Sequence, residues 1–253
     1  GLVQCYRISG YELAGELSRK VCYFLKDHAQ LFDKAGRFLP NTPPSQDKDQ
    51  GFADIGSGGA SHFHGHTICI LNMLGYALHS NDQELLEFIK TSFEWARQQG
   101  EQTLLRPSSP LESVEYAAEG NLGYFPENLF ALYHEQAESC EVADMIGIGL
   151  KLAAGGVGDY WDDVDRWIRN QFAENQLMDT RWLHAFSESL PAAEAVKDER
   201  YCEKDVIERN RGAFAGWALP NAWMGAQAHF RKGIMHCCTG NGARAIYYIW
   251  EHI

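Results

Sequence analysis

Apolar residues recur every three or four positions along most of the chain, which is the spacing of an amphipathic helix. Residues 67–80 are apolar enough for a buried helix. Residues 11–32 predict another helix, with one buried face formed by Leu13, Leu17, Val21, Phe24 and Leu25. Alternating runs of strand length are scarce. The pattern therefore predicts an all-α protein.

Capping residues and glycines divide the rest of the pattern into further helices. Asn81 is expected to cap a helix over 82–99, which Gly100 ends. Ser139 is expected to cap a helix over 140–154. The last two helices are expected over 159–177 and, with Asn241 as N-cap, over 242–252.

Long loops rich in proline and glycine separate these helices. A unit of two helices and a long loop recurs with a period of roughly 40 to 50 residues, as in helical-pair repeats. Such hairpins stack into solenoids or close into toroids, with their loops gathered on one face. The residues that could bind a metal or take part in catalysis lie in the predicted loops 57–66, 106–140 and 212–241. A shared site is therefore expected on the face where these loops gather.

Composition narrows the class of protein. The 253 residues, 45% of them hydrophobic, suit one large core, and we expect a single domain over 1–253. The net charge of −12, without a basic patch, argues against nucleic-acid binding. No apolar run is long enough to span a membrane. The first residues show no signal peptide, and the cysteines are expected to be reduced. Both features favour a cytoplasmic location for the protein.

Two cysteine motifs carry the strongest chemical signal. Glu138-Ser139-Cys140 and Cys237-Cys238 together offer three sulfurs and one carboxylate, a ligand set that suits tetrahedral Zn²⁺. Neither motif has the spacing of residues that share a helix face, so an extended stretch or a turn is expected at each. The competing interpretation is that these are core cysteines beside a surface glutamate.

Histidines and glutamates upstream offer further candidates. The segment Ser61–His66 holds three histidines, which suit a metal site, a locally hydrogen-bonded loop, or contacts to sugar hydroxyls. A glutamate before residue 138 can act as a general acid if burial raises its pKa. The candidates are Glu112, Glu115, Glu119 and Glu127. Solvated surface charge is the alternative for most of them.

Together these residues resemble the family-127 glycoside hydrolases, the retaining β-L-arabinofuranosidases and their relatives. The order and approximate spacing agree from about residue 60 to the end of the chain. The matching pieces are His64-Gly65-His66-Thr67, Glu138-Ser139-Cys140, the helix with Asp159-Tyr160, Asp163, Arg166 and Asn170, and Cys237-Cys238 before Asn241-Gly242. The combination of Glu-x-Cys with Cys-Cys is the most specific of them.

The resemblance implies an (α/α) toroid in which Glu138, Cys140, Cys237 and Cys238 bind Zn²⁺ and Cys237 attacks the anomeric carbon. It implies that a glutamate before the Glu-x-Cys motif is the acid and base. It also implies that His64, and His66 in the place of the family's asparagine, contact a carbohydrate substrate.

The chain departs from the family in two ways. The acid/base position has no direct counterpart, and Glu127 and Glu119 are its nearest substitutes. The family's six-hairpin barrel is also longer, so this chain corresponds to part of one, completed by a further segment, domain or partner chain. Two alternatives remain: a non-catalytic helical toroid whose structural zinc supports binding of carbohydrate or a protein partner, and a toroidal polysaccharide lyase.

Overall fold

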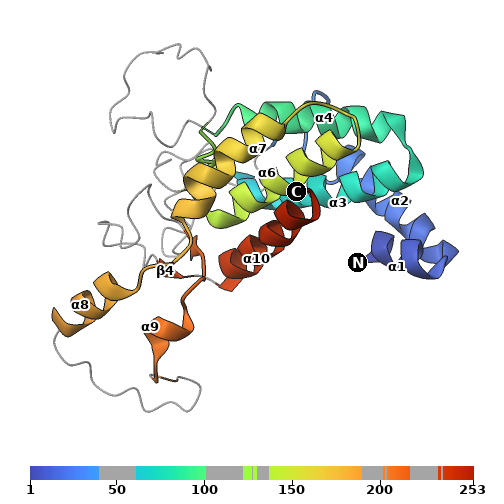
Figure 1. Cartoon of the computed structure of the whole chain (residues 1–253). Coiled ribbons are helices and arrows are strands. Elements are labelled where there is room, and N and C mark those ends of the chain that lie inside the picture. Colours follow the sequence, from blue (N-terminus) through green and yellow to red (C-terminus); the bar gives the residue numbers. More distant parts are fainter. Residues whose placement is uncertain are drawn as a thin grey trace, which may run out of the picture.

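The computed structural model describes residues 1–39, 61–100, 122–126, 128–129, 137–189, 202, 204–216, 233–234 and 236–253. This part of the chain is predominantly helical, as the periodicity predicts (Figure 1). The helices are α1 (Leu2–Ser9), α2 (Glu12–Asp27), α3 (Phe63–Ser80), α4 (Gln83–Arg97), α6 (Ser139–Ala154), α7 (Trp161–Trp167), α8 (Arg181–Ser189), α9 (Val206–Arg209) and α10 (His236–Glu251).

Strands in the described residues are only two residues long. β1 (Ser61–His62) pairs antiparallel with β2 (Asn128–Leu129), and β3 (Ala215–Gly216) pairs antiparallel with β4 (Gly233–Ile234). The π-helical segment Ile168–Phe172 continues α7. No described helix is both long and apolar enough to cross a membrane.

Helices α3, α6 and α10 lie side by side and run parallel (Figure 1). Their N-terminal parts meet, since the side chain of His64 in the first turn of α3 contacts Asp144 in the second turn of α6 and Asn241 in the second turn of α10. Their last turns also lie together: a Cβ on Gly155, just after α6, would come within 2.6 Å of Leu78 in α3. The parallel arrangement brings three helix N-termini to one place.

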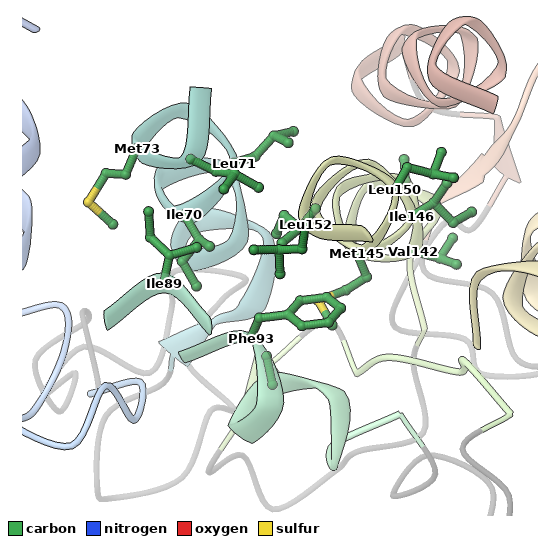
Figure 2. Packing of buried hydrophobic residues seen from close by; sticks show 14 of the residues in the cluster. Ile70, Leu71, Met73, Ile89, Phe93, Val142, Met145, Ile146, Leu150 and Leu152 are labelled. Carbon is green, nitrogen blue, oxygen red and sulfur yellow. The ribbon is translucent and has the colours of Figure 1, made fainter. Parts of the chain in front are cut away.

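Helix α6 forms the centre of the core. All but three of its residues are buried, which suits a helix that is apolar around its whole circumference. Figure 2 shows Leu152 and Met145 on the side of α6 that faces α3 and α4, whereas Val142, Ile146 and Leu150 point away from those two helices. The neighbouring helix α7 passes so close to Gly149 that a Cβ there would lie 2.7 Å from Val164. Glycine thus permits the close approach of α7.

The exposed face of α2 overturns one sequence expectation. Leu13, Leu17, Val21 and Phe24 are between 40% and 59% exposed, although their spacing predicts a buried face. The buried residues of α2 are instead Ala14, Gly15, Ser18 and Cys22. These small side chains let neighbouring helices approach, and the ring of Tyr6 in α1 lies about 3.1 Å from the position of a Cβ on Gly15. Periodicity identified the apolar face but not which face is covered.

Several helix boundaries also differ from expectation. Asp82 caps α4, because its carboxylate accepts a hydrogen bond from the backbone N–H of Leu85. Asn81 instead ends α3 in the left-handed conformation that asparagine tolerates. Helix α3 begins four residues early, at Phe63, and α10 begins six residues early, at His236. The two early starts place histidines and cysteines in first turns rather than in loops.

Candidate metal centre

The cysteine motifs lie at the N-termini of α6 and α10. Glu138 occupies the N-cap position of α6, and Cys140 lies in its first turn. Cys237 and Cys238 lie in the first turn of α10, which corrects the expectation of a turn at this pair. Side chains on a helix tilt toward its N-terminus, so adjacent residues of a first turn can converge on a point beyond the helix end. The two sulfurs are 3.8 Å apart.

The four predicted ligands form one compact cluster, defined here as the cysteine cluster. One ligand atom from each of Glu138, Cys140, Cys237 and Cys238 lies within 4.8 Å of the others. The Sγ atoms of Cys140 and Cys238 are 3.6 Å apart. Glu138 Oε1 lies 2.8 Å from the Sγ of Cys238 and 3.8 Å from that of Cys237. Such a group can hold a metal ion.

The burial of the cysteine cluster favours binding of a cation. Cys140, Cys238 and Glu138 are buried, and Cys237 is partly exposed. The hydrogen-bonded contact with the Cys140 sulfur, together with burial and the Glu138 carboxylate, raises the pKa of Cys238. Burial chiefly raises the pKa of Cys237. Anionic sulfurs therefore need a positive partner, and the N-termini of two helices and a bound cation both supply one.

A polar network supports the cluster from the side of α3 and α10. Asn241 Nδ2 lies 3.1 Å from the Sγ of Cys140 and 3.3 Å from Nε2 of His64. The other ring nitrogen of His64 lies 2.7 Å from the Asp144 carboxylate. Asp144 also accepts hydrogen bonds from Thr67 and Arg244. These contacts fix the position of Asn241 and thereby of the sulfur that it contacts.

The backbone around Glu138 is held by two further contacts. The hydroxyl of Ser139 donates to the carbonyl of Ala215 at 2.7 Å, rather than capping α6 as expected. Gln171, in the π-helical segment, donates to the carbonyl of Glu138 at 3.4 Å, and its own oxygen accepts from the N–H of Phe125. The irregular turn after α7 thus helps to position Glu138.

The two predicted sugar-contacting histidines have different environments. The side chain of His64 is 19% exposed and lies beside the cysteine cluster through Asn241. His66 is fully buried and stacks on Phe38, with its ring nitrogens 3.0 Å from the carbonyls of His62 and Leu39. Burial lowers the pKa of His66. His66 therefore stabilises the core, and only His64 faces the site.

The predicted acid/base glutamates, Glu119 and Glu127, lie outside the described residues, as do Glu112 and Glu115. Their described neighbours nevertheless border the site. Pro126 forms a β-bridge with Ala137, and Asn128 pairs with His62. Pro126 thus lies beside the start of α6, and Asn128 beside the start of α3.

Asp144 and Arg244 complete the polar network around His64 and Asn241, but the predictions from sequence included neither residue. Asp144 carries a detectable signal, because it is a lone carboxylate in an otherwise apolar part of α6, four residues after Cys140. A charged residue in such a position is seldom buried without a partner. Arg244, in contrast, is one of several polar residues in α10, and nothing in its spacing distinguishes it.

A cavity of about 860 Å³ lies at the opposite end of the parallel helices. It is lined by the last turns of α3, α6 and α10 and by Arg7. No cysteine lines this cavity, so its size does not make it the chemical site.

Comparison of the chain with protein-family models, curated proteins and solved structures found no match.

Proposed function

We propose that the chain is the zinc-thiolate core of a retaining glycoside hydrolase, with Zn²⁺ held by Glu138, Cys140, Cys237 and Cys238. The observation that carries the metal assignment is the spacing of the sulfurs. Sulfurs about 2.3 Å from a tetrahedral Zn²⁺ lie about 3.8 Å apart. The two measured separations are 3.6 and 3.8 Å. The 2.8 Å contact between the Cys238 Sγ and Glu138 Oε1 is a direct hydrogen bond, which a shared ion would replace.

The difference in exposure among the sulfurs favours Cys237 as the nucleophile. Cys140 and Cys238 are fully buried, whereas Cys237 is partly exposed and within reach of a substrate. Bound Zn²⁺ keeps the sulfurs ionised near neutral pH. The Sγ of Cys237 attacks the anomeric carbon while the bond to the leaving oxygen breaks, and a carboxylic acid protonates that oxygen. The same carboxylate then takes a proton from water, which displaces the sulfur with overall retention.

The position of its neighbours favours Glu127 over Glu119 as the acid and base. Pro126, before Glu127, forms a β-bridge with Ala137 next to the start of α6, and Asn128, after it, pairs with His62 next to the start of α3. His64, partly exposed beside the cluster, is proposed to contact a sugar hydroxyl. Its hydrogen bond to Asp144 fixes the ring orientation.

The helix arrangement supports the proposal that the chain forms part of an (α/α) toroid. In such a fold an inner set of parallel helices alternates with antiparallel outer helices. Here α3, α6 and α10 are the parallel set, while α4 and α7 are the connecting helices beside them (Figure 1). The exposed apolar residues of α2 and of α10, among them Trp250, are consistent with additional helices that complete the barrel.

Metal analysis tests the first half of the proposal. Purified protein is expected to hold one Zn²⁺ per chain, and Cys140→Ser is expected to lose it. Cys5→Ser is the matched control, since Cys5 is exposed on α1, away from the cluster. Substoichiometric zinc that is equal in all three proteins contradicts the zinc site.

Turnover of activated aryl glycosides tests the second half. Cys237→Ser is expected to abolish turnover. Glu127→Gln is expected to remove the pH dependence of turnover that the acid causes, and the covalent glycosyl intermediate on Cys237 is expected to accumulate and to be detected by mass spectrometry. Zinc bound with no turnover across a panel of aryl glycosides supports instead the non-catalytic toroid. Unsaturated products that absorb in the ultraviolet indicate a lyase.

A further inference from the structure

A second group of potential ligands adjoins the cysteine cluster. His62 ends β1, Glu138 precedes α6, and Glu141 lies in the first turn of α6. One ligand atom from each lies within 4.8 Å of the others. Nε2 of His62 is 3.8 Å from Oε2 of Glu138 and 3.9 Å from Oε1 of Glu141.

The two separations from His62 fit a cation better than a direct contact. A hydrogen bond between an imidazolium and a carboxylate has a heavy-atom distance of about 2.7–2.9 Å. Nitrogen and oxygen ligands about 2.0–2.2 Å from a shared divalent cation lie about 3 to 4 Å apart. The measured distances fall in the second range and outside the first.

Glu138 connects this group to the cysteine cluster through its two oxygens. Oε1 faces Cys238 at 2.8 Å, and Oε2 faces His62. One carboxylate can therefore bridge two cations, as in metal sites whose two ions are about 3.5–4 Å apart. The short spacing between Glu138 and Glu141 in sequence places both carboxylates at one helix start.

Burial also favours binding of a cation by the two carboxylates. Glu138 and Glu141 are 3% and 0% exposed. A carboxylate in a buried, low-dielectric site attracts a cation more strongly than a carboxylate in water does.

We propose that His62, Glu138 and Glu141 form a second divalent-cation site, which shares the Glu138 carboxylate with the cysteine cluster. Its ligands are one imidazole and two carboxylates, a set that accepts Mn²⁺ as well as Zn²⁺. The thiolates of the cysteine cluster prefer Zn²⁺. The side chain of His62 is 41% exposed, so the ion has access from solvent. With three protein ligands, positions remain for water or for ligand oxygens.

This proposal goes beyond the glycosidase proposal and does not depend on turnover. Protein loaded with one equivalent of Zn²⁺ is titrated with Mn²⁺, and free Mn²⁺ is measured by electron paramagnetic resonance. One Mn²⁺ per chain is expected to bind. His62→Ala and Glu141→Gln are each expected to weaken Mn²⁺ binding at least tenfold while the bound Zn²⁺ remains, which also shows that the variants fold.

His184→Ala is the matched control, because His184 is an exposed histidine paired with Glu208 on another part of the chain. It is expected to bind Mn²⁺ like the unaltered protein. The proposal is overturned if no Mn²⁺ binds, or if Mn²⁺ binds equally well to all three variants. Loss of Zn²⁺ from the unaltered protein would instead refute the cysteine site. Binding of one Mn²⁺ to that zinc-free protein, weakened by His62→Ala, would still support the second site, and no Mn²⁺ binding would overturn it.

Discussion

Asp144 shows that the centre depends on residues that offer no ligand to it. This fully buried carboxylate contacts His64, Thr67 and Arg244, which come from two other helices. Through His64 it orients Asn241, whose amide contacts the Cys140 sulfur. Replacing residues that orient metal ligands in this way typically weakens metal binding 10- to 100-fold.

Replacing Asn241 tests this dependence. Asn241→Ala removes the amide that lies 3.1 Å from the Cys140 sulfur and is expected to weaken zinc binding by about 10- to 100-fold. Competition with a chromophoric chelator measures the change. Asn72→Ala is the control, since Asn72 is exposed on α3 and contacts only the carbonyl of Ile68 among the bonds described. Equal zinc affinity in both variants would contradict the supporting role of Asn241.

Protonation of His66 is expected to make folding sensitive to acid. Burial lowers its pKa in the folded state, so the unfolded chain binds the proton more readily. The stabilisation from neutral His66 is present above the unfolded value near 6.5 and is lost as the pH falls below it. For one such group, the free energy of unfolding changes by at most about 1.4 kcal/mol per pH unit.

Urea denaturation of zinc-free protein between pH 7.5 and 5.5 measures the effect of His66. The unaltered protein is expected to lose stability more steeply than His66→Gln, which cannot titrate. Parallel pH profiles of the two proteins would show that His66 is not the group responsible.

At the scale of elements, glycines of α6 set how closely its neighbours pack. A Cβ on Gly147 would lie 2.8 Å from the ring of Tyr248 in α10. The sulfurs of Cys237 and Cys238 are carried by the same helix, so the spacing between α6 and α10 sets the geometry of the cluster. A side chain at residue 147 forces the helices apart or displaces the Tyr248 ring.

Gly147→Ala is expected to destabilise the protein by about 1–3 kcal/mol through overpacking. Gly75→Ala is the matched control within a helix, because no atom lies within 4 Å of the added Cβ. That variant is expected to stabilise by roughly 0.5–1 kcal/mol, the difference in helix propensity. Chemical denaturation measures both. A destabilised Gly75→Ala together with a neutral Gly147→Ala would contradict the packing described.

Sequence patterns predicted the existence of α3, α4 and α6, because apolar spacing is a local property, but they misplaced the start of α3 and the N-caps of α4 and α6. They failed at the start of α10, where Gly240 and Gly242 favoured a turn. In the structure Gly242 is helical, and its missing Cβ makes room for the ring of Phe214, which would lie 2.4 Å away. The four members of the cysteine cluster were predicted from the motifs Glu138-Ser139-Cys140 and Cys237-Cys238 and from the family resemblance. The network around Asp144 depends on tertiary contacts between helices, which spacing does not reveal.

For the whole molecule, a metal ion would link segments that are far apart in sequence. A ligand that binds only the folded state stabilises it by about 2.7 kcal/mol at a concentration one hundred times its Kd. Removing zinc with a chelator is therefore expected to lower the melting temperature.

Hydrogen exchange then locates the effect of the metal. Zinc removal is expected to increase exchange first at the start of α10, which is held to the core by α6, and least in α3 and α4. Cys140→Ser should melt at the same temperature with and without chelator. Uniform exchange along all helices after zinc removal would show that the metal does not act through the cysteine cluster.

The separation of the ligands also has a consequence for folding. Cys140 and Cys238 are 98 positions apart, so the chain must close a long loop before their sulfurs can meet. Contacts of that range form late, after the local hairpin of α3 and α4. Until α10 docks on α6, the thiols of a newly made chain are open to oxidants and to premature metal capture. Because α10 is synthesised after α6, we expect the reducing power and the zinc supply at that stage to affect the yield of folded protein.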